Sequence, residues 1–246
     1  MNLIIDIGNS YTKVAIFYEN KVIFVSEKLR NDYESVIKLL NDIFSEFKVI
    51  KKCILSSVIS KDEELIQFLT KQPFLFMKMT NSTKIPIKNL YKTPQTLGKD
   101  RLAAVVGANN IFPDKNVLVF DAGTALTIDF INSKNEYEGG NISPGLKMRF
   151  RALHEFTQKL PELNPENDIN FLLGRTTNEA IIAGVQNSLI FEIQNYISIF
   201  EDKYPDLKIF FTGGDTIFFE NKLKKNIFAK PNLVLTGLNR ILEYNV

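Results

Sequence analysis

The residues from Leu3 to Phe17 combine groups that can hold phosphate and a metal ion. A short apolar run ends at Asp6, and a second apolar run follows Gly8 and a polar stretch, which predicts two strands joined by a tight turn. The turn offers a carboxylate for hydrated Mg²⁺, backbone amides for phosphate oxygens and the ammonium group of Lys13. These groups suit a nucleoside triphosphate, although Asp and Gly are also common in ordinary tight hairpins.

The same pattern occurs a second time, in residues 118–130. In this second copy the aspartate, the glycine and the following polar residue are Asp121, Gly123 and Thr124. They align at a constant separation with the corresponding residues of the first copy. Two copies of an apolar-Asp-x-Gly-polar hairpin predict duplicated halves, with one aspartate from each half facing a common cleft.

The composition is that of an ordinary globular protein. Of the 246 residues, 45% are hydrophobic, enough for the core of one large or two modest domains. The 30 Lys and Arg residues are scattered and nearly balanced by 28 Asp and Glu residues, so the charge pattern of a nucleic-acid-binding protein is missing. The chain has no apolar run of membrane-spanning length and begins with a strand rather than a signal peptide, which predicts a cytoplasmic protein without membrane contact.

The chain contains one cysteine, Cys53, and one histidine, His154. These counts exclude a disulfide framework, a thiolate metal site and a multi-histidine metal site. A Ser-His-Asp triad would have to use His154. The helical spacing of Leu153, Phe156 and Leu160 around it favours a histidine on a helix surface or in the core over a catalytic one.

Strands and helices alternate along the chain, as they do in α/β folds. Apolar patterning predicts further strands at residues 21–26, 51–58, 74–77, 137–142 and 208–211, and helices at 33–47, 62–70 and 234–245. A Phe-Pro-Asp sequence at residues 112–114 marks a boundary, which divides the chain into residues 1–113 and 114–246.

Asp100 lies in the sequence Gly98-Lys99-Asp100-Arg101, between an irregular loop at residues 84–96 and an apolar run at 102–108. An acidic residue at the start of a helix can simply complement the helix dipole. Its place at the end of a long loop also suits a chemical role, because loops carry functional groups more often than scaffolds do. Both interpretations remain open.

Residues 176–179 have the pattern of a capping box, in which Thr176 begins a long apolar helix. Such a helix can cover a sheet or pair with a second chain. Two glycine-rich turns, at residues 139–145 and 212–215, lack the spacing of a P-loop or a dinucleotide fingerprint. Their glycines still allow a ligand to approach the backbone closely.

These motifs, in this order and spacing, resemble the type III pantothenate kinases over nearly the whole chain. The resemblance implies an α/β fold with two ribonuclease-H-like halves around a nucleotide cleft, as in the actin-like ATPases, sugar kinases and Hsp70 chaperones. It also implies the ATP-dependent phosphorylation of pantothenate to 4'-phosphopantothenate, the first step of coenzyme A synthesis.

The resemblance assigns roles to individual residues. The implied ATP-binding residues are Asp6, Ile7, Gly8, Asn9, Ser10, Tyr11, Thr12, Lys13 and Thr124, with Mg²⁺ held at Asp6 through water. Asp100 would accept the proton of the substrate hydroxyl, and Asp121 would bind a monovalent cation, K⁺ or NH₄⁺. The implied pantothenate contacts are Tyr91, Gly98, Lys99, Asp100, Arg101 and Thr176, of which Thr176 reaches across a homodimer, so that the sites lie at the subunit interface.

Physical chemistry agrees with this allocation, because phosphoryl transfer depends mainly on positioning and charge neutralisation. Arg101 favours the ionised form of the neighbouring Asp100, and its planar guanidinium suits the carboxylate of pantothenate. The two competing interpretations are an actin-like or Hsp70-like ATPase and a regulatory accessory factor without kinase activity. The first would need subdomains for which 246 residues leave little room, and the second lacks a DNA-reading motif.

Overall fold

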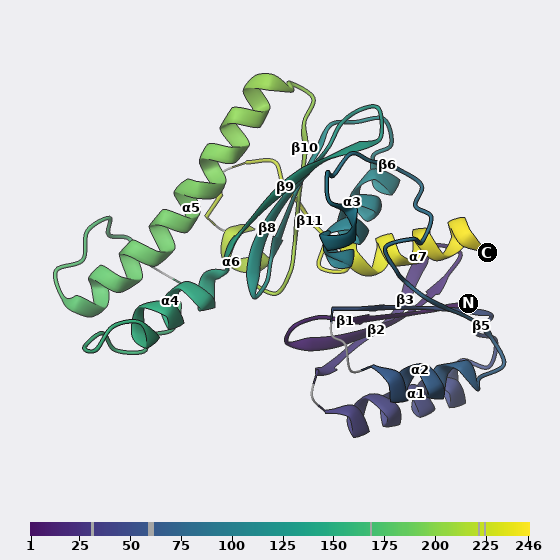
Figure 1. Ribbon diagram of the computed structural model, residues 1–246. Coiled ribbons are helices and arrows are strands. Elements are labelled where there is room, and N and C mark those ends of the chain that lie inside the picture. Colours follow the sequence, from purple (N-terminus) through teal and green to yellow (C-terminus); the bar gives the residue numbers. More distant parts are fainter. Residues whose placement is uncertain (31, 59–61, 168, 221, 224) are drawn as a thin grey trace. The chain divides into compact units, whose positions relative to one another are not determined.

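The computed structural model describes residues 1–30, 32–58, 62–167, 169–220, 222–223 and 225–246 (Figure 1). These residues group into two compact units. Unit 1 consists of Met1–Ile111 and Leu233–Val246, and unit 2 consists of Phe112–Asn232. Each unit contains a mixed β-sheet with helices, as the alternation of strands and helices in the sequence predicts.

The sheet of unit 1 has the strand order β3-β2-β1-β4-β5. Its strands are β1 (Asn2–Ile7), β2 (Tyr11–Tyr18), β3 (Lys21–Leu29), β4 (Lys52–Ser57) and β5 (Leu75–Lys78). The first three strands pair antiparallel, whereas β4 and β5 run parallel to β1. Leu3, Ile4 and Ile5 are fully buried, because β1 lies in the middle of the sheet and both of its faces are covered.

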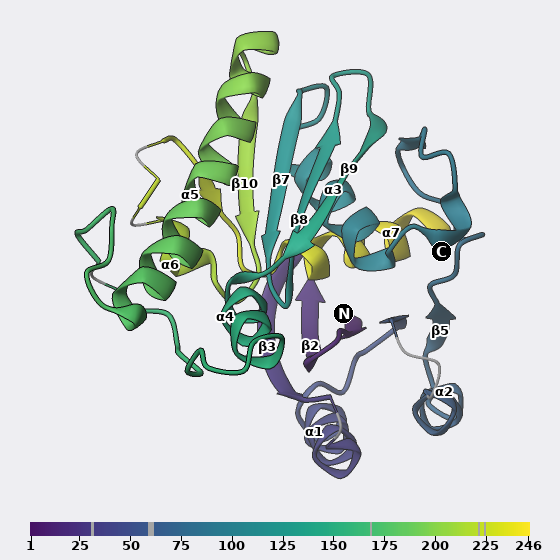
Figure 2. The ribbon, with the colours of Figure 1, turned by 60° about the vertical axis from the view of Figure 1, so that its left-hand side comes forward.

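Helices cover both faces of this sheet (Figures 1 and 2). On one face, α1 (Tyr33–Glu46) and α2 (Glu63–Thr70) bury Leu40 and Leu69 against β1 and β4. On the other face lie α3 (Lys99–Ile111) and α7 (Leu233–Asn245). The chain between β5 and α3 includes a two-residue strand, β6 (Lys88–Asn89), and one 3₁₀ turn, η1 (Pro94–Thr96).

Two glycines let α3 and α7 pack backbone to backbone. A Cβ atom at Gly107 would lie 3.0 Å from the nitrogen of Gly237, and one at Gly237 would lie 2.6 Å from the carbonyl carbon of Ala103. No larger residue fits at Gly237 without separating the helices. This close packing fixes the position of α3, and α3 carries Asp100 in its first turn.

The sheet of unit 2 repeats the topology of unit 1. Its strands are β7 (Val117–Ala122), β8 (Ala125–Ile131), β9 (Glu136–Pro144), β10 (Lys208–Thr212) and β11 (Phe228–Ala229), in the order β9-β8-β7-β10-β11. Again three strands pair antiparallel, and two further strands run parallel to the first of them. The prediction of an α/β fold with two similar halves is confirmed.

One face of the unit 2 sheet is covered by α5 (Thr177–Lys203), together with α4 (Leu146–Glu155) and α6 (Thr216–Glu220) (Figure 2). The expected helical spacing around His154 extends only to Glu155. Phe156 is 85% exposed, and the hydroxyl of Thr157 bonds to a carbonyl of the last turn, so the helix ends before the residues that were expected to continue it. None of the helices in the described ranges is long and apolar enough to cross a bilayer.

The sequence-based division after residue 113 differs from the two compact units at the C-terminus. In the repeated topology α7 follows β11 as α3 follows β5, so α7 belongs to the second repeat by order along the chain. By packing it groups with unit 1, because Gly107 and Gly237 permit its close contact with α3. The division into evolutionary halves stays a prediction.

Candidate active site

The first Asp-x-Gly hairpin joins β1 and β2 through a three-residue turn. The N–H group of Gly8 donates to the carbonyl oxygen of Tyr11 at 2.9 Å, which closes the turn. Ile7 and Thr12 on either side are buried, whereas Asn9 and Ser10 at the tip are exposed. The strands therefore anchor the hairpin in the sheet and present its polar tip to the surroundings.

Asp6 is 8% exposed and lies in the sheet between Lys13 of β2 and Ser56 of β4. The pKa of the Asp6 carboxyl is raised to about 6, chiefly by burial and also by the charge of Asp100, while Ser56 and the Lys13 ammonium oppose the rise. Ser56 acts here through proximity, because neither Oδ1 of Asp6 nor the Ser56 hydroxyl forms a hydrogen bond of regular geometry with the described residues.

Most buried polar atoms of a folded protein form hydrogen bonds, so each one without a partner needs an explanation. Oδ1 of Asp6 and Oγ of Ser56 belong to paired positions of neighbouring strands. Carboxylate and hydroxyl oxygens are suitable ligands for Mg²⁺ and its coordinated water. The chemistry of these oxygens is compatible with the expected magnesium site, and Ser56 is a candidate that the sequence analysis did not single out.

Asp100 lies in the first turn of α3, where neighbouring residues restrict its side chain. Its Oδ1 accepts a hydrogen bond from the backbone N–H of Arg101 at 2.8 Å. A Cβ atom at Gly98 would lie 2.5 Å from the same oxygen, so only glycine leaves the carboxylate in this place. The Lys99 ammonium donates to the carbonyl oxygen of Ser57 at 3.0 Å and ties the start of α3 to the end of β4.

Arg101 and Tyr91 form a second part of the site in unit 1. Arg101 is 5% exposed, and its guanidinium carbon lies 5.7 Å from the centre of the Tyr91 ring, within the range of a cation–π interaction. The N–H of Tyr91 donates to the side chain of Asn89 at 2.9 Å, which helps to fix this part of the loop. The structure thus brings the loop residue Tyr91 to the Gly-Lys-Asp-Arg turn.

The second hairpin, in unit 2, has a shorter turn than the first. The N–H of Gly123 donates to the carbonyl oxygen of Ala125 at 3.1 Å, which leaves two residues between the strands. The glycine-rich turn after β9 closes on this hairpin, because the N–H of Gly145 donates to the carbonyl oxygen of Thr124 at 3.2 Å. A Cβ at Gly145 would lie 2.6 Å from that oxygen, so the contact requires glycine.

The other glycine-rich turn approaches Asp121. Gly213 has φ +92°, and a Cβ there would lie 2.5 Å from Oδ1 of Asp121. One side of the half-buried carboxylate thus lies against the backbone of this turn, and carboxylate and carbonyl oxygens are the donors that hard cations prefer. Asp215 follows in the same turn. Its burial raises the pKa of its carboxyl, and Lys147 opposes the rise.

Thr176 begins α5, and the predicted capping box is confirmed. The Thr176 hydroxyl accepts from the N–H of Glu179 at 3.2 Å, and the Glu179 carboxylate accepts from the N–H of Thr176 at 3.2 Å. Thr176 is exposed. Its role inside this chain is that of a helix cap, and its contact with a ligand stays a prediction.

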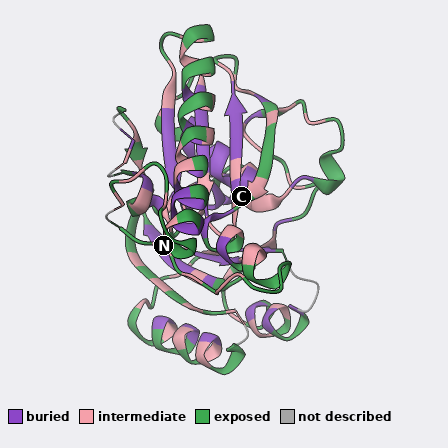
Figure 3. Cartoon of the chain, turned by 90° about the vertical axis from the view of Figure 1, so that its left-hand side faces the viewer, coloured by how far each residue is buried: buried purple, intermediate pink, exposed green. Residues whose placement is uncertain are grey.

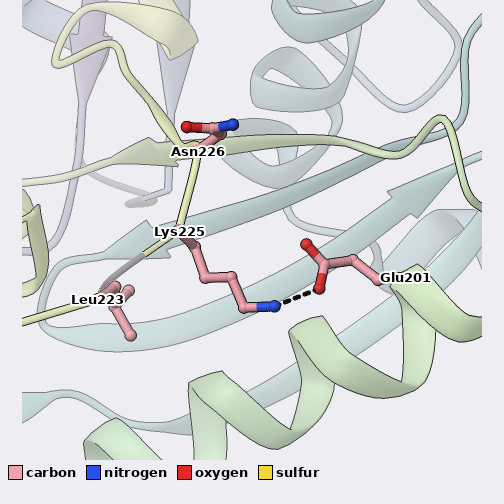
Figure 4. Close-up of a pocket in the computed structure, with 4 residues that line it drawn as sticks. All are labelled: Glu201, Leu223, Lys225 and Asn226. Carbon is pink, nitrogen blue, oxygen red and sulfur yellow. Dashed lines mark hydrogen bonds and ion pairs between the residues drawn. The ribbon is translucent and has the colours of Figure 1, made fainter.

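Two further places were considered as sites. His154 is exposed, and its Nδ1 lies 2.8 Å from the carbonyl oxygen of Leu160, as expected for a histidine on a helix surface. An open surface pocket is lined by Glu201, Leu223, Lys225 and Asn226 (Figure 4). It contains none of the predicted site residues, and its main feature is an ion pair between Lys225 and Glu201.

Comparison with known proteins identifies the family. The model of the type III pantothenate kinase family matches residues 2–198. The chain belongs to this family. It is 47% identical over 245 residues to a type III pantothenate kinase of Phocaeicola vulgatus, with 100% of this chain and 99% of the relative covered. A type III pantothenate kinase of Christiangramia forsetii is 42% identical over 245 residues, with 100% and 99% covered.

Solved structures confirm the fold. A Baf family transcriptional activator, described as putative, from Campylobacter jejuni has a TM-score of 0.63 at 23% identity, covering 99% of this chain and 98% of that one. A putative N-acetylmannosamine kinase of Listeria monocytogenes has a TM-score of 0.54 at 11% identity, covering 100% and 99%. At these identities the likeness concerns the fold alone, which is that of the sugar kinases and actin-like ATPases.

Proposed function

We propose how the residues of this chain divide the work in the reaction of its family, the ATP-dependent phosphorylation of pantothenate to 4'-phosphopantothenate. The observation that carries the proposal is the setting of Asp100. Gly98 leaves room for its carboxylate, a hydrogen bond from the Arg101 N–H orients it, and Lys99 ties its helix to β4. A carboxylate held this firmly beside a polar hairpin suits a base that receives one proton from a defined direction.

In this proposal Asp100 accepts the proton of the pantothenate hydroxyl as that oxygen attacks the terminal phosphate of ATP. The hairpin of residues 6–13, including Lys13, is the proposed phosphate-binding segment, and Thr124 is a further proposed ATP contact. Bound Mg²⁺ would neutralise charge on the phosphates, and Asp6 and Ser56 are the residues that hold it through water. Cytoplasmic ATP is the phosphate donor, so we place the protein in the cytoplasm.

Arg101 is the proposed partner of the pantothenate carboxylate. The Arg101 side chain is buried, and its guanidinium lies over the Tyr91 ring. Water would therefore compete only weakly with a carboxylate for hydrogen bonds to this guanidinium. Gly98, Lys99 and Tyr91 complete the contacts on this side.

Asp121 is the proposed ligand of the monovalent cation, K⁺ or NH₄⁺. Its half-buried carboxylate lies against the backbone of the Gly213 turn, which supplies an oxygen-rich setting for a cation of low charge density. A cation there would also reduce the repulsion between Asp121 and the phosphates of ATP.

The proposal includes a homodimer in which a second copy covers the outward face of α5. Small or apolar residues recur on this face at helical spacing and are exposed: Ala180, Gly184, Ser188 and Phe191 (Figure 3). Phe191 is 53% exposed, and Leu173, just before α5, is 81% exposed. Such a patch on a helix that begins with Thr176 supports pairing that brings Thr176 to the pantothenate site of the partner.

The decisive experiment measures ATP turnover by the full chain with and without pantothenate, in K⁺ buffer with Mg²⁺. We expect turnover to depend on pantothenate and to produce 4'-phosphopantothenate. Asp100→Asn should lower turnover by roughly two powers of ten or more and leave ATP binding nearly intact, as expected for the loss of a general base. ATP hydrolysis that is indifferent to pantothenate would favour an actin-like or Hsp70-like ATPase instead.

A further inference from the structure

A polar network joins three elements of unit 2 next to the Gly145 turn. The guanidinium of Arg149, on α4, donates to the carboxylate of Glu192, on α5, at 2.5 Å. The hydroxyl of Ser143, at the end of β9, donates to the same carboxylate at 2.8 Å. Arg149 also lies 3.2 Å from the Ser143 hydroxyl and donates through Nε to the carbonyl oxygen of Pro144 at 2.8 Å.

Arg149 and Glu192 are therefore bonded to each other and anchored to residues 143 and 144 of β9 by three further hydrogen bonds. The side chains of Arg149 and Glu192 are 18% and 24% exposed, so water competes with the pair only in part. One turn further along α5, the hydroxyl of Tyr196 accepts from the side chain of Asn141 at 3.1 Å. The end of β9 is thus held from two helices.

The residue that follows this anchored segment is Gly145, whose N–H donates to the carbonyl oxygen of Thr124. The N–H of Arg149 bonds back to the carbonyl oxygen of Gly145 at 3.0 Å, so the first turn of α4 includes the same glycine. Residues 143–145 are thus linked to the second hairpin by this hydrogen bond and by the pairing of β9 with β8, in which Pro144 lies opposite Ala125 and Ser143 opposite Leu126.

We propose that Arg149 and Glu192 are positioning residues that hold the Gly145 turn against Thr124 and thereby set the affinity for ATP. The inference rests on the ATP contact that the proposed function assigns to Thr124. It adds a residue of α5, the helix proposed to form the dimer, to the support of the nucleotide site. A charge-assisted network between two helices and a strand is suited to this task, because it fixes direction as well as distance.

Other ion pairs of the same helices provide matched controls. Arg151 and Glu155 form an i,i+4 pair on α4 with side chains 71% and 45% exposed, and this pair does not involve β9. Lys225 pairs with Glu201 near the end of α5, with side chains 40% and 36% exposed (Figure 4). Exposed pairs of this kind contribute little to stability, so Glu155→Gln and Glu201→Gln should leave the site unchanged.

The test compares Glu192→Gln, Arg149→Gln and the double variant with these controls. Three quantities are measured on the full chain: the dissociation constant of ATP without pantothenate, the KM and kcat values for both substrates, and amide hydrogen exchange in residues 121–126 and 141–149. Ser143→Ala is included as a milder variant that removes one shared hydroxyl, in case a charge variant fails to fold.

We expect Glu192→Gln and Arg149→Gln each to raise the dissociation constant and the KM of ATP about tenfold, the change that follows the loss of one charge-assisted hydrogen bond. Exchange at the Gly145 amide should accelerate, the KM of pantothenate should change less than threefold, and the double variant should resemble the single ones. Ser143→Ala should show the same pattern with a smaller change.

A purely structural network would instead lower kcat through a smaller folded fraction and leave the KM of ATP unchanged, which would overturn the inference. Faster exchange at the Gly145 amide with an unchanged affinity for ATP would overturn it as well. Failure of the proposed function is a separate result, because it would appear as a parent protein without pantothenate phosphorylation. In that event ATP affinity and amide exchange still decide whether the network positions the turn.

Discussion

Ionised Asp6 should reduce the stability of the protein without ligands, and Asp6→Asn should therefore stabilise it. Burial raises the pKa of this carboxyl from its ordinary value of 3.8 to about 6. Between these two pH values the folded protein keeps a proton that the unfolded chain has lost, so stability falls as the pH rises and the loss is complete above about pH 6. A difference of about 2 pH units corresponds to about 3 kcal/mol.

Asparagine has nearly the shape of aspartate and carries no charge. Its amide can donate to the Ser56 hydroxyl, which has no hydrogen-bond partner among the described residues, and the repulsion from Asp100 disappears. We expect Asp6→Asn to gain up to about 3 kcal/mol at pH 7.5 and about 1 kcal/mol at pH 4.5. For a chain of this size the larger gain raises Tm by roughly 5–10 °C. Turnover should fall at least about a hundredfold.

Thermal unfolding followed by circular dichroism, without nucleotide or Mg²⁺, measures both values. Asp42→Asn, which removes an exposed carboxylate from α1, is the control and should change Tm by little at either pH. An equal gain at the two pH values would show that charge is not the cause. A loss of stability at pH 7.5 would refute the reasoning altogether, because it would mean that the ionised carboxylate is well solvated or well paired in the folded protein.

Four further predictions follow from the site and the packing. Gly98→Ala should push the Asp100 carboxylate aside and lower kcat about tenfold to a hundredfold with ATP affinity unchanged, as steady-state kinetics will show. Gly237→Ala should destabilise unit 1 by about 2–3 kcal/mol in urea unfolding, because its Cβ overlaps a carbonyl group of α3. Turnover should need K⁺ or NH₄⁺. Equal activity in a buffer whose only cations are Mg²⁺ and a bulky organic amine would refute the assignment of a monovalent cation to Asp121. Asp100→Ala and Thr176→Arg should each be nearly inactive as homodimers. Mixing and reassorting the two should restore about a quarter of the parent activity, because one site of each heterodimer has both residues intact. Heterodimers that form but remain inactive would show that Thr176 is only a helix cap.

Much of the fold is predictable from the sequence because the signals are local. The apolar run before Asp6 and the one before Asp121 specify strands, and the glycine two residues later specifies a turn, so both hairpins were located correctly. The capping box at Thr176 was also local, since it depends on two side chains within one helical turn. Periodicity then sufficed to predict the long helix, although it did not locate the end of α4.

The missing parts of the site depend on pairing between distant segments. Ser56 lies beside Asp6 because β4 runs parallel to β1 in one register, and a shift by one residue would turn its side chain to the other face of the sheet. Nothing in the residues around Ser56 specifies that register. Tyr91, by contrast, was named from the family resemblance, although its contact with Arg101 also depends on the path of a long loop.

The packing of α7 illustrates a different limit. Gly107 and Gly237 are unremarkable within their own helices, where glycine simply weakens the helix by about 1 kcal/mol relative to alanine. The reason for glycine at these positions becomes clear only from the packing of the two helices, since a Cβ at either position would collide with the backbone of the other helix. The close packing of the two helices therefore offsets the low helix propensity of these glycines, and it holds α3, which carries Asp100, in place.

The two Asp-x-Gly hairpins lie in different surroundings, which is the reason for proposing a different cation at each. Asp6 lies within the sheet, 8% exposed, with Ser56 opposite it and a second carboxylate nearby, a setting that raises its pKa and favours a strongly charged cation. Asp121 is half-buried and lies against the backbone of the Gly213 turn, with Gly145 closing on Thr124. Backbone oxygens near this carboxylate would suit the proposed monovalent cation. The motif is the same in both halves, and the neighbouring strands and turns decide its chemistry.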